Sequence, residues 1–397
     1  MKLADRVYKI SPSPTLVLDA KAKEMISQGI NVVNFGVGEP DFDTPQHIKD
    51  AAIDAINKGF TKYTPASGIA ELKAAAVKKF KEDNGLEYKP SQVIVSVGAK
   101  HSIFNAVMAV ISEGDECVIP APYWVSYPEM VKIAGGKSVI IPLTEVDNFK
   151  LTPEKLEKAI TPKSKMIILN TPSNPTGSVY TKEELKAVAD VCKKHDIIIV
   201  SDEVYEKLMY DHAQHVSIAS VSEDAYKRTV TVNGVSKAYA MTGWRIGYAA
   251  ANQEIVTAMN NIQGHVTTNP TSISQKAAVA ALLGPQEPLK KMLEAFRERA
   301  DYTFKRVNEI PGFFCRKPLG AFYVFPNVAK IFGKKVAGQV IENADQLCAL
   351  FLEKAQVAIV PGSGFGSPDN IRISYATSME KIVDGLNRVD AMLKGVL

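Results

Sequence analysis

The sequence predicts an α/β protein whose larger domain holds a mostly parallel, mixed sheet flanked by helices, with a smaller α+β domain beside it. From about residue 44 to 283, β-branched runs alternate with amphipathic stretches of helical length. This alternation is typical of a parallel sheet that helices cover on both faces. After about residue 284 the pattern changes to one long helical stretch and several short strands. The 397 residues allow two or three domains, and 46% hydrophobic residues suit a folded globular chain.

The larger domain is expected to span residues 46–284. Thr44 and Pro45 predict the start of its first helix, as N-cap and first-turn proline, and Gly59 predicts the end. Thr181 and Glu184 have capping-box spacing and predict a helix that runs to about residue 194. A further helix is expected at 100–111. The expected strands are 92–97, 116–120, 165–170, 196–201, 228–232 and 245–250.

The smaller domain is expected to combine residues 1–45 with residues 285–397. The first 40 or so residues show no strand run of the larger domain's kind, so we expect them to pack with the C-terminal part. In that part we expect helices at 287–308 and 345–354 and a last helix from Ser378. We expect short strands at 312–316, 321–325, 357–360 and 371–375.

Composition excludes several classes of function. The net charge is +4, from 47 basic and 43 acidic residues, which is too small to indicate binding to nucleic acid or to a membrane. The N-terminus has no signal-peptide core, and no apolar run has the length of a membrane span. The four cysteines form no CxxC pair, which is typical of free thiols in a reducing compartment. We therefore expect a cytoplasmic protein.

Three ligand-binding motifs are absent or incomplete in this sequence. Gly36 and Gly38 begin like a dinucleotide fingerprint, but Asp41 stands where the third glycine belongs. No GxxxxGK[ST] loop precedes Lys237. His212 and His215 flank a polar turn, but no carboxylate or cysteine stands at a matching spacing, so we expect no metal.

Polar residues at the ends of the predicted strands indicate where a ligand binds, because open α/β sheets bind ligands beyond the carboxyl ends of their strands. Lys237 follows the run TVTVNG, and Arg245 comes eight residues later between Gly243 and Gly247. A single lysine is usually a surface residue. A lysine at a strand end in a cleft can have a lowered pKa and act as a nucleophile, and a nearby guanidinium suits a phosphate.

The segment SKAYAMTGWRIG, residues 236–247, resembles the lysine signature of the class I aminotransferases. The resemblance extends from SPSPT at Ser11 to IRISYAT at Ile371 and is strongest to bacterial aspartate aminotransferases. It implies the fold called type I among pyridoxal-phosphate (PLP) enzymes, with a seven-stranded sheet in the large domain. It also implies that Lys237 forms a Schiff base with PLP, that amino acids and 2-oxo acids are the substrates, and that the protein is a homodimer with shared active sites.

The resemblance implies a role for each site residue. Asp202 keeps the pyridine nitrogen of PLP protonated, Tyr205 and Asn174 share the phenolate oxygen, and Trp124 stacks on the ring. Asn174 and Trp124 also border the substrate. The phosphate is bound by Gly98, Ala99, Lys100, Ser236 and Arg245, and by Tyr63 of a neighbouring subunit.

The substrate is expected to bind through its carboxylates. Arg372 resembles the arginine that pairs with the α-carboxylate, and Gly38 the glycine whose backbone contacts it. Lys100 resembles the lysine assigned to a distal carboxylate, although a lysine at a helix start is also commonly exposed. Ser11 replaces a basic residue that several relatives carry, which weakens the case for prephenate. Gly234 replaces a hydroxyl residue that helps to hold the phosphate in many relatives.

The predicted reaction is therefore the conversion of aspartate and 2-oxoglutarate to oxaloacetate and glutamate. Lys237 would carry the proton between the substrate and the cofactor as general base and acid. Three alternatives stay open. They are an aminotransferase with a broader, aromatic or alanine donor range, a PLP-dependent β-lyase on the same fold, and a non-catalytic binding protein on this scaffold.

Overall fold

Seven strands form the main sheet, in the order β2-β8-β7-β6-β5-β3-β4. The computed structural model describes residues 2–396. Strand β8 runs antiparallel to both of its neighbours, and every other pair in this sheet is parallel. The predicted mixed, mostly parallel sheet is confirmed. The strands are β2 (Val93–Val97), β3 (Glu116–Ala121), β4 (Lys137–Pro142), β5 (Ser164–Asn170), β6 (Ile198–Asp202), β7 (Thr229–Gly234) and β8 (Ile246–Ala250).

Strand β4 has no counterpart among the strands expected from the sequence. It lies at the edge of the sheet, and only Ile141 of its six residues is buried. An edge strand with one buried position lacks the continuous apolar run that marks the central strands. The other six strands lie within a few residues of their predicted positions.

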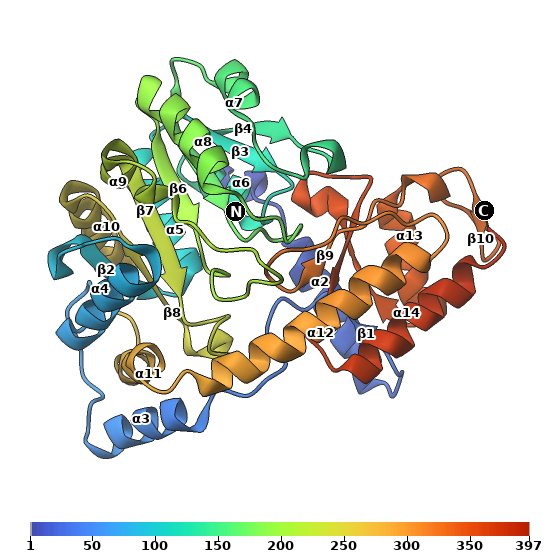
Figure 1. Cartoon of the computed structure of the whole chain (residues 1–397), viewed down its shortest axis with the longest axis horizontal. Coiled ribbons are helices and arrows are strands. Elements are labelled where there is room, and N and C mark those ends of the chain that lie inside the picture. Colours follow the sequence, from blue (N-terminus) through green and yellow to red (C-terminus); the bar gives the residue numbers. More distant parts are fainter. Residues whose placement is uncertain (1, 397) are drawn as a thin grey trace.

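Helices cover both faces of this sheet (Figure 1). Ile94 packs with residues of α5 (Ala99–Val110) and α10 (Gln253–Val266), whereas its neighbours Val93 and Val95 pack with α4 (Ala70–Asn84) and α11 (Ser272–Leu283). This period-two alternation buries apolar side chains on both sides, and each fully buried Val or Ile contributes roughly 1.5–3 kcal/mol. The further covering helices are α6 (Ser126–Ile133), α7 (Pro153–Ala159), α8 (Lys182–Lys194) and α9 (Glu223–Arg228).

The two predicted helix starts have different outcomes. The capping box of α8 is confirmed, because the Thr181 amide donates to Glu184 Oε2 at 2.7 Å and the Glu184 amide donates to Thr181 Oγ1 at 3.3 Å. The predicted N-cap role of Thr44 is wrong. Its hydroxyl donates to the Ala240 carbonyl at 2.7 Å and accepts from Trp244 Nε1 at 3.0 Å. Thr44 therefore ties the start of α3 (Gln46–Asn57) to the loop after Lys237.

Long helix α12 (Glu287–Glu309) leads from the main sheet to a smaller α+β region (Figure 1). There β13 (Val360–Pro361), β14 (Ile371–Ser374) and β9 (Tyr323–Val324) form a three-stranded antiparallel sheet beside α13 (Ala344–Leu350) and α14 (Met379–Leu393). Near the N-terminus, β1 (Val33–Asn34) pairs in parallel with β12 (Val357–Ala358). The first segment of the chain therefore contacts the last third, although the domain boundaries at 45 and 285 stay a prediction.

Some details of the smaller region differ from expectation. The predicted strand at 312–316 is wrong, since Phe314 makes only an isolated bridge to Asn327. Gly312 takes a φ of +82° and turns the chain, which leaves too short an extended run to pair as a strand. The predicted helix at 345–354 is α13 followed by a single π-helical turn, Phe351–Ala355. The other α-helices and strands of the described residues are α1 (Asp5–Lys9), α2 (Pro14–Ser27) and the hairpin of β10 (Lys335–Val336) and β11 (Gln339–Val340).

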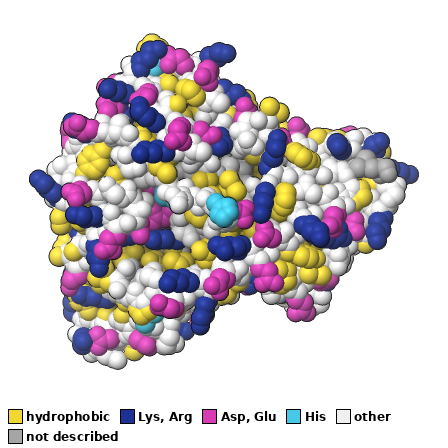
Figure 2. Space-filling model, in the orientation of Figure 1, with side chains coloured by type: hydrophobic (Ala, Val, Ile, Leu, Met, Phe, Trp, Pro, Cys, Tyr) yellow, Lys and Arg dark blue, Asp and Glu magenta, His cyan; other side chains and the backbone are white. Residues whose placement is uncertain are grey.

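The surface shows no gathering of one charge on the face drawn in Figure 2, where basic and acidic side chains are interspersed. Within residues 2–396, none of the helices combines the length and the apolar character that crossing a bilayer requires.

Candidate active site

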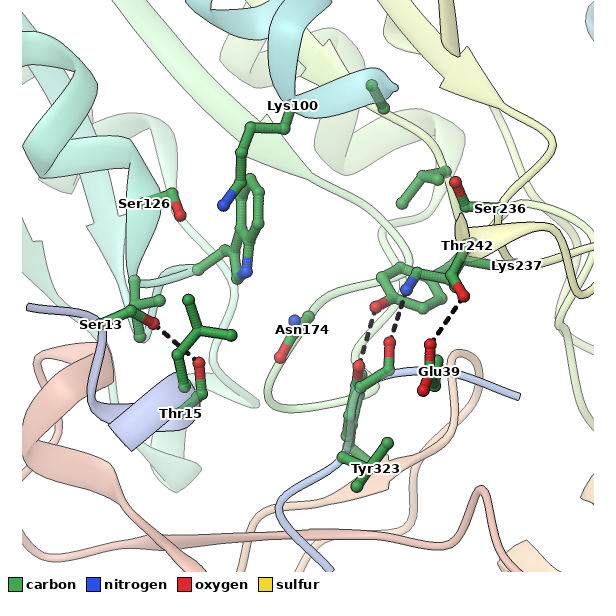
Figure 3. A pocket seen from close by; sticks show the side chains of 18 of the residues that line it. Ser13, Thr15, Glu39, Lys100, Ser126, Asn174, Ser236, Lys237, Thr242 and Tyr323 are labelled. Atoms are coloured by element: carbon green, nitrogen blue, oxygen red, sulfur yellow. Dashed lines mark hydrogen bonds between the residues drawn. The ribbon is translucent and has the colours of Figure 1, made fainter. Parts of the chain in front are cut away.

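Polar side chains beyond the carboxyl ends of β5, β6 and β7 meet in a pocket of about 450 Å³. Residues from the first 40 positions, such as Ser13 and Gly38, line it from a second side, and Tyr323 and Arg372 line it from the smaller α+β region. Figure 3 shows Lys100, Ser126, Ser13 and Thr15 at one end of the pocket and Lys237, Ser236 and Thr242 at the other. The pocket thus lies where an open α/β sheet places its ligand.

Basic side chains outnumber acidic ones in the pocket lining, five to three. Four of the five make no salt bridge with any carboxylate of residues 2–396. They are Lys100, Lys237, Arg245 and Arg372. Arg372 is buried and Lys237 is half-buried, whereas Lys100 and Arg245 are exposed. An unpaired charge that is withdrawn from water is costly, so proteins keep one mainly where a ligand supplies the opposite charge. The pocket is built for an anionic ligand.

Lys237 lies in the turn after β7, and its Nζ donates to the Gly38 carbonyl at 2.5 Å. Burial lowers the pKa of this amine to about 8, and the nearby guanidinium groups of Arg372 and Arg245 add to that effect. Glu39 and Asp202 act in the opposite direction. A lysine with a pKa near 8 is partly neutral at physiological pH, and the neutral amine is the form that attacks a carbonyl carbon.

Asp202 ends β6 with its side chain in the pocket and 5% of its surface exposed. The Tyr127 hydroxyl donates to Asp202 Oδ2 at 2.7 Å, and the Val204 amide donates to Oδ1 at 3.3 Å. Burial raises the pKa of this carboxyl to about 6, although both hydrogen bonds oppose the shift. A cationic group bound beside it would restore a low pKa, so Asp202 suits a ligand with a basic nitrogen.

The N-terminus of α5 forms an anion cradle with Arg245. The first amides of a helix have no partner within it, and α5 has no side-chain cap. The Arg245 guanidinium lies over this end, donating to the Thr242 carbonyl at 2.9 Å and the Val97 carbonyl at 3.3 Å. Gly98 has a φ of +82°, and a Cβ there would stand 2.3 Å from Arg245 Nη2. Only glycine leaves this cradle open.

Arg372 enters the pocket from β14 and is 2% exposed. It donates to Asn174 Oδ1 at 3.0 Å and to the Gly36 carbonyl at 2.8 Å, and its Nε has no hydrogen-bond partner among the described residues. Burial lowers the pKa of this guanidinium. The ring centre of Tyr323 lies 4.5 Å from its Cζ. A buried guanidinium held only by neutral groups is suited to a carboxylate that arrives with the ligand.

Comparison with known proteins identifies the family. Residues 30–389 match the family described as aminotransferase class I and II. The chain is 53% identical to the aspartate aminotransferase of Bacillus subtilis (strain 168), over 98% of each chain. It is 50% identical to the aspartate/prephenate aminotransferase of Nitrosomonas europaea, over 99% of this chain and 100% of that one. The crystal structure of the Rhizobium meliloti aspartate aminotransferase superposes with a TM-score of 0.96 at 45% identity, over the whole of both chains.

The chain belongs to the class I and II aminotransferases. Members of this family depend on PLP, and the protein is a PLP-dependent aminotransferase of fold type I. The residues of the pocket fit the cofactor. The glycine-lined cradle at α5 suits its phosphate, the partly neutral amine of Lys237 suits its aldehyde, and the buried carboxyl of Asp202 suits its pyridine nitrogen.

The structure brings together most of the predicted site residues of this aminotransferase. All of them line the pocket except Gly98, which lies beside Arg245, and Tyr63. Tyr63 is 88% exposed and does not line the pocket of its own chain. At Gly234, a Cβ would stand 3.2 Å from the Gly247 Cα and the Ile246 carbonyl oxygen, so a hydroxyl residue would fit only if this backbone moved by a few tenths of an ångström.

Sequence reasoning missed two tyrosines of the site. Tyr127 supports Asp202, and Tyr323 places its hydroxyl 2.9 Å from that of Tyr205. Tyr127 stands only three residues after Trp124, and its ring centre lies 5.4 Å from that of Trp124, so its closeness in sequence to a predicted site residue is a signal that could have found it. Tyr323 lies on a two-residue strand of the smaller region, and no local pattern of the sequence connects it with the pocket.

The reason given for expecting no metal is wrong in one respect. Among the described residues, Glu203, Glu206 and His215 place their ligand-type atoms within 4.8 Å of one another, so carboxylates do stand beside His215. However, Lys79 Nζ already contacts Glu206, and an ammonium group therefore occupies the position of a counter-ion. The absence of a metal stays a prediction.

Proposed function

We propose that this aminotransferase converts aspartate and 2-oxoglutarate to oxaloacetate and glutamate, in a pocket that binds the carboxylates at both ends of the substrate. One observation carries the proposal. The pocket holds Arg372 and Lys100 as two separate cations without carboxylate partners among residues 2–396, and the amine of Lys237 lines the same pocket. A dicarboxylic amino acid supplies two anions to match the two cations.

Lys237 would attach the cofactor and then move the proton. When bound, PLP withdraws electrons from the substrate Cα and stores the amino group between the two halves of the reaction. The pKa of about 8 would let the released amine of Lys237 accept a proton from Cα near neutral pH and deliver it to the cofactor carbon that carried the aldehyde. The proton therefore stays on one side chain that reaches both positions.

The surrounding residues would orient the ring and hold the phosphate. Asp202, kept in place by Tyr127, would stay ionised beside the protonated pyridine nitrogen. Tyr205 and Asn174 would donate to the ring oxygen, and Trp124 would stack on the ring. The phosphate would bind to Ser236, to Arg245 and to the backbone of Gly98, Ala99 and Lys100 at the start of α5.

Arg372 would bind the α-carboxylate, assisted by the backbone at Gly38. Its Nε and the hydrogen-bonded Nη groups already point into a buried, aromatic-walled position. Because these groups are fixed before the substrate arrives, little side-chain entropy is lost on binding. A guanidinium also offers two parallel hydrogen bonds, which a lysine cannot.

Lys100 would bind the distal carboxylate. Its Nζ lies 4.7 Å from the centre of the Trp124 ring. The residue as a whole is exposed, but the pocket partly desolvates its amine and lowers the pKa, with the Arg245 charge adding to the shift. Ser13 and Thr15, whose hydroxyls are 2.9 Å apart, line the same end of the pocket (Figure 3). A cation among hydroxyls is suited to a carboxylate, whereas an apolar donor side chain would leave this end unsatisfied.

The donor range tests this proposal. Purified protein with 2-oxoglutarate should turn over aspartate faster than alanine or aromatic donors. Lys100→Ala should lower kcat/KM for aspartate by about 10–100-fold, the size of one charge-assisted contact, and change that for alanine little. The surface variant Lys132→Ala is the matched control, since Lys132 pairs with Glu129 on α6. Equal losses for aspartate and alanine would contradict the role of Lys100.

The same assay separates the other candidate functions. A PLP-dependent β-lyase would release product without leaving the amino group on the cofactor, so its bound spectrum would not alternate between two forms. Prephenate enters as a test substrate because the Nitrosomonas europaea relative is an aspartate/prephenate aminotransferase. Ser11 offers no cation, so we expect prephenate to be a poorer acceptor than 2-oxoglutarate.

We further propose a cytoplasmic homodimer with shared active sites. Tyr63, 88% exposed and outside its own pocket, would reach the phosphate in the other subunit. The test mixes Lys237→Ala with Tyr63→Ala. If Tyr63 acts across the interface, mixed dimers contain one intact site and regain activity that neither variant has alone. No regain in verified mixed dimers would contradict the sharing.

A further inference from the structure

The turn that follows β6 carries side chains to opposite sides of the chain. Asp202 and Tyr205 line the active-site pocket, whereas Glu203 and Glu206 are buried outside it, at 0% and 6% exposure. All four side chains belong to five consecutive residues. Whatever fixes the two glutamates therefore also fixes the backbone that presents Asp202 and Tyr205.

His215 is the group that connects Glu203 to a separate segment of the chain. Its Nε2 lies 2.9 Å from Glu203 Oε2 and 3.9 Å from Glu206 Oε2, and its side chain is 8% exposed. The hydroxyls of Ser201 and Ser217 both donate to Glu203 Oε1 at 2.7 Å. Glu203 is thus held on both oxygens, and His215 and Ser217 supply the contacts from the loop that follows the turn.

Glu206 is held from another direction, by α4. Lys79 Nζ contacts Glu206 Oε1, and Asn84 Nδ2 donates to Glu206 Oε2 at 2.9 Å. Lys79 also approaches Asp83 at 3.8 Å, and Asp83 pairs with Lys207 at 2.6 Å. The buried part therefore contains two carboxylates and one ammonium, and the imidazole of His215 contacts the carboxylates through Nε2, while its Nδ1 has no hydrogen-bond partner among the described residues. In line with this, Glu203 and Glu206 raise the pKa of His215 despite its burial.

We propose that His215 is a positioning residue of the active site, whose contact with Glu203 fixes the 202–206 turn and thereby the placement of Asp202 and Tyr205 against the bound cofactor. This inference rests on the roles proposed above for Asp202 and Tyr205. A residue in this position acts through the backbone, without touching substrate or cofactor. Displacing catalytic groups by about 1 Å is enough to cost roughly a hundredfold in rate, so the link is strong enough to measure.

The test compares His215→Leu and His215→Gln with His195→Gln. His195 is the matched control, because its Nε2 also lies 2.8 Å from a glutamate, Glu157, but at the surface of the large domain. Three quantities are measured in the whole protein. They are the dissociation constant of PLP, the pH midpoint of the visible absorption band of the bound cofactor, and the melting temperature of the cofactor-free protein.

We expect His215→Leu to weaken PLP binding by roughly tenfold and to move the pH midpoint of the band. His215→Gln, which still offers an N–H to Glu203, should recover part of both effects, and His195→Gln should match the wild type. If His215→Leu does not fold, His215→Gln is the test instead. A shift of the pH midpoint of its absorption band supports the inference, and an unchanged midpoint with wild-type PLP affinity contradicts it.

A purely structural role would give a different result. A lower melting temperature in the His215 variants, with wild-type PLP affinity and an unmoved midpoint, would overturn the inference. Failure of the wild type itself to bind PLP would instead show that the proposed function is wrong.

Discussion

The two sides of the 202–206 turn differ in how buried charges are paired. On the inner side, Glu203 and Glu206 are matched by Lys79, His215 and the neighbouring hydroxyls and amides. On the pocket side, Arg372 and Lys237 make no salt bridge with any carboxylate of the described residues. The comparison teaches that burial alone does not mark an active site in this protein. What distinguishes the active site is charged side chains that are withdrawn from water and have no carboxylate partner in the protein, because a bound ligand can supply the missing opposite charge.

The largest expected effect comes from removing the unmatched charge at Arg372. Arg372→Leu should lower kcat/KM for every amino-acid donor by about 10²–10³-fold, because a buried bidentate pair with the α-carboxylate contributes roughly 3–4 kcal/mol. Steady-state kinetics with aspartate and alanine measure it. Arg388→Leu, which removes a surface arginine paired with Asp384, is the control. A loss confined to aspartate would mean that Arg372 does not bind the α-carboxylate.

On the side of the turn that holds Glu203 and Glu206, a substitution should lower the stability of the protein. Lys79→Met leaves Glu206 without its ammonium, and breaking one partner of a buried pair costs roughly 3–5 kcal/mol in the free energy of unfolding. Chemical denaturation of the cofactor-free protein measures this change. Lys227→Met removes a lysine from a fully exposed pair with Glu223 and should change the free energy of unfolding far less than Lys79→Met does. Similar losses in the two variants would erase the contrast between the buried and exposed pairs.

Removing the amine of Lys237 should raise the free energy of unfolding, whereas Lys79→Met should lower it. The pKa falls from 10.5 in the unfolded chain to about 8 in the folded one, so the unfolded state binds more protons between these values. Below pH 8 the folded state carries the full cost of the buried charge, on the order of 3 kcal/mol. Lys237→Met should therefore stabilise the cofactor-free protein by up to that amount at pH 7, with the gain fading between pH 8 and 10.5. Unfolding curves at pH 7 and 10 check it, and a destabilised variant at pH 7 would refute the sign.

The parts of the fold that the sequence could predict are those governed by local pattern. The central strands are continuous apolar runs, because both faces of the sheet are covered, and the α8 capping box is a contact between residues three apart. Edge strand β4 lacks such a run. The sequence around Thr44 predicts a local cap, whereas its hydroxyl bonds to Ala240 and Trp244, which lie 196 and 200 residues away. Contacts of that kind leave no periodic trace in the sequence.

The same division holds for the site. Lys237, Asp202 and Arg245 follow strands or fall in a recognisable motif, so their positions could be predicted. Tyr323 could not, because its hydroxyl meets that of Tyr205 from a separate sheet. No sequence spacing marks the carboxylates around His215, because this cluster is assembled by α4, the turn after β6 and a loop.

The central claim is that Lys237 is the residue that bonds to the aldehyde of PLP. Reduction with borohydride makes such a bond permanent, so the wild-type protein should be incubated with PLP, reduced, digested and examined by mass spectrometry. The account predicts one pyridoxyl-phosphate adduct, on the peptide that contains Lys237, and its loss in Lys237→Ala with loss of the visible absorption band. An adduct on another lysine, or unchanged labelling and turnover in Lys237→Ala, would contradict it.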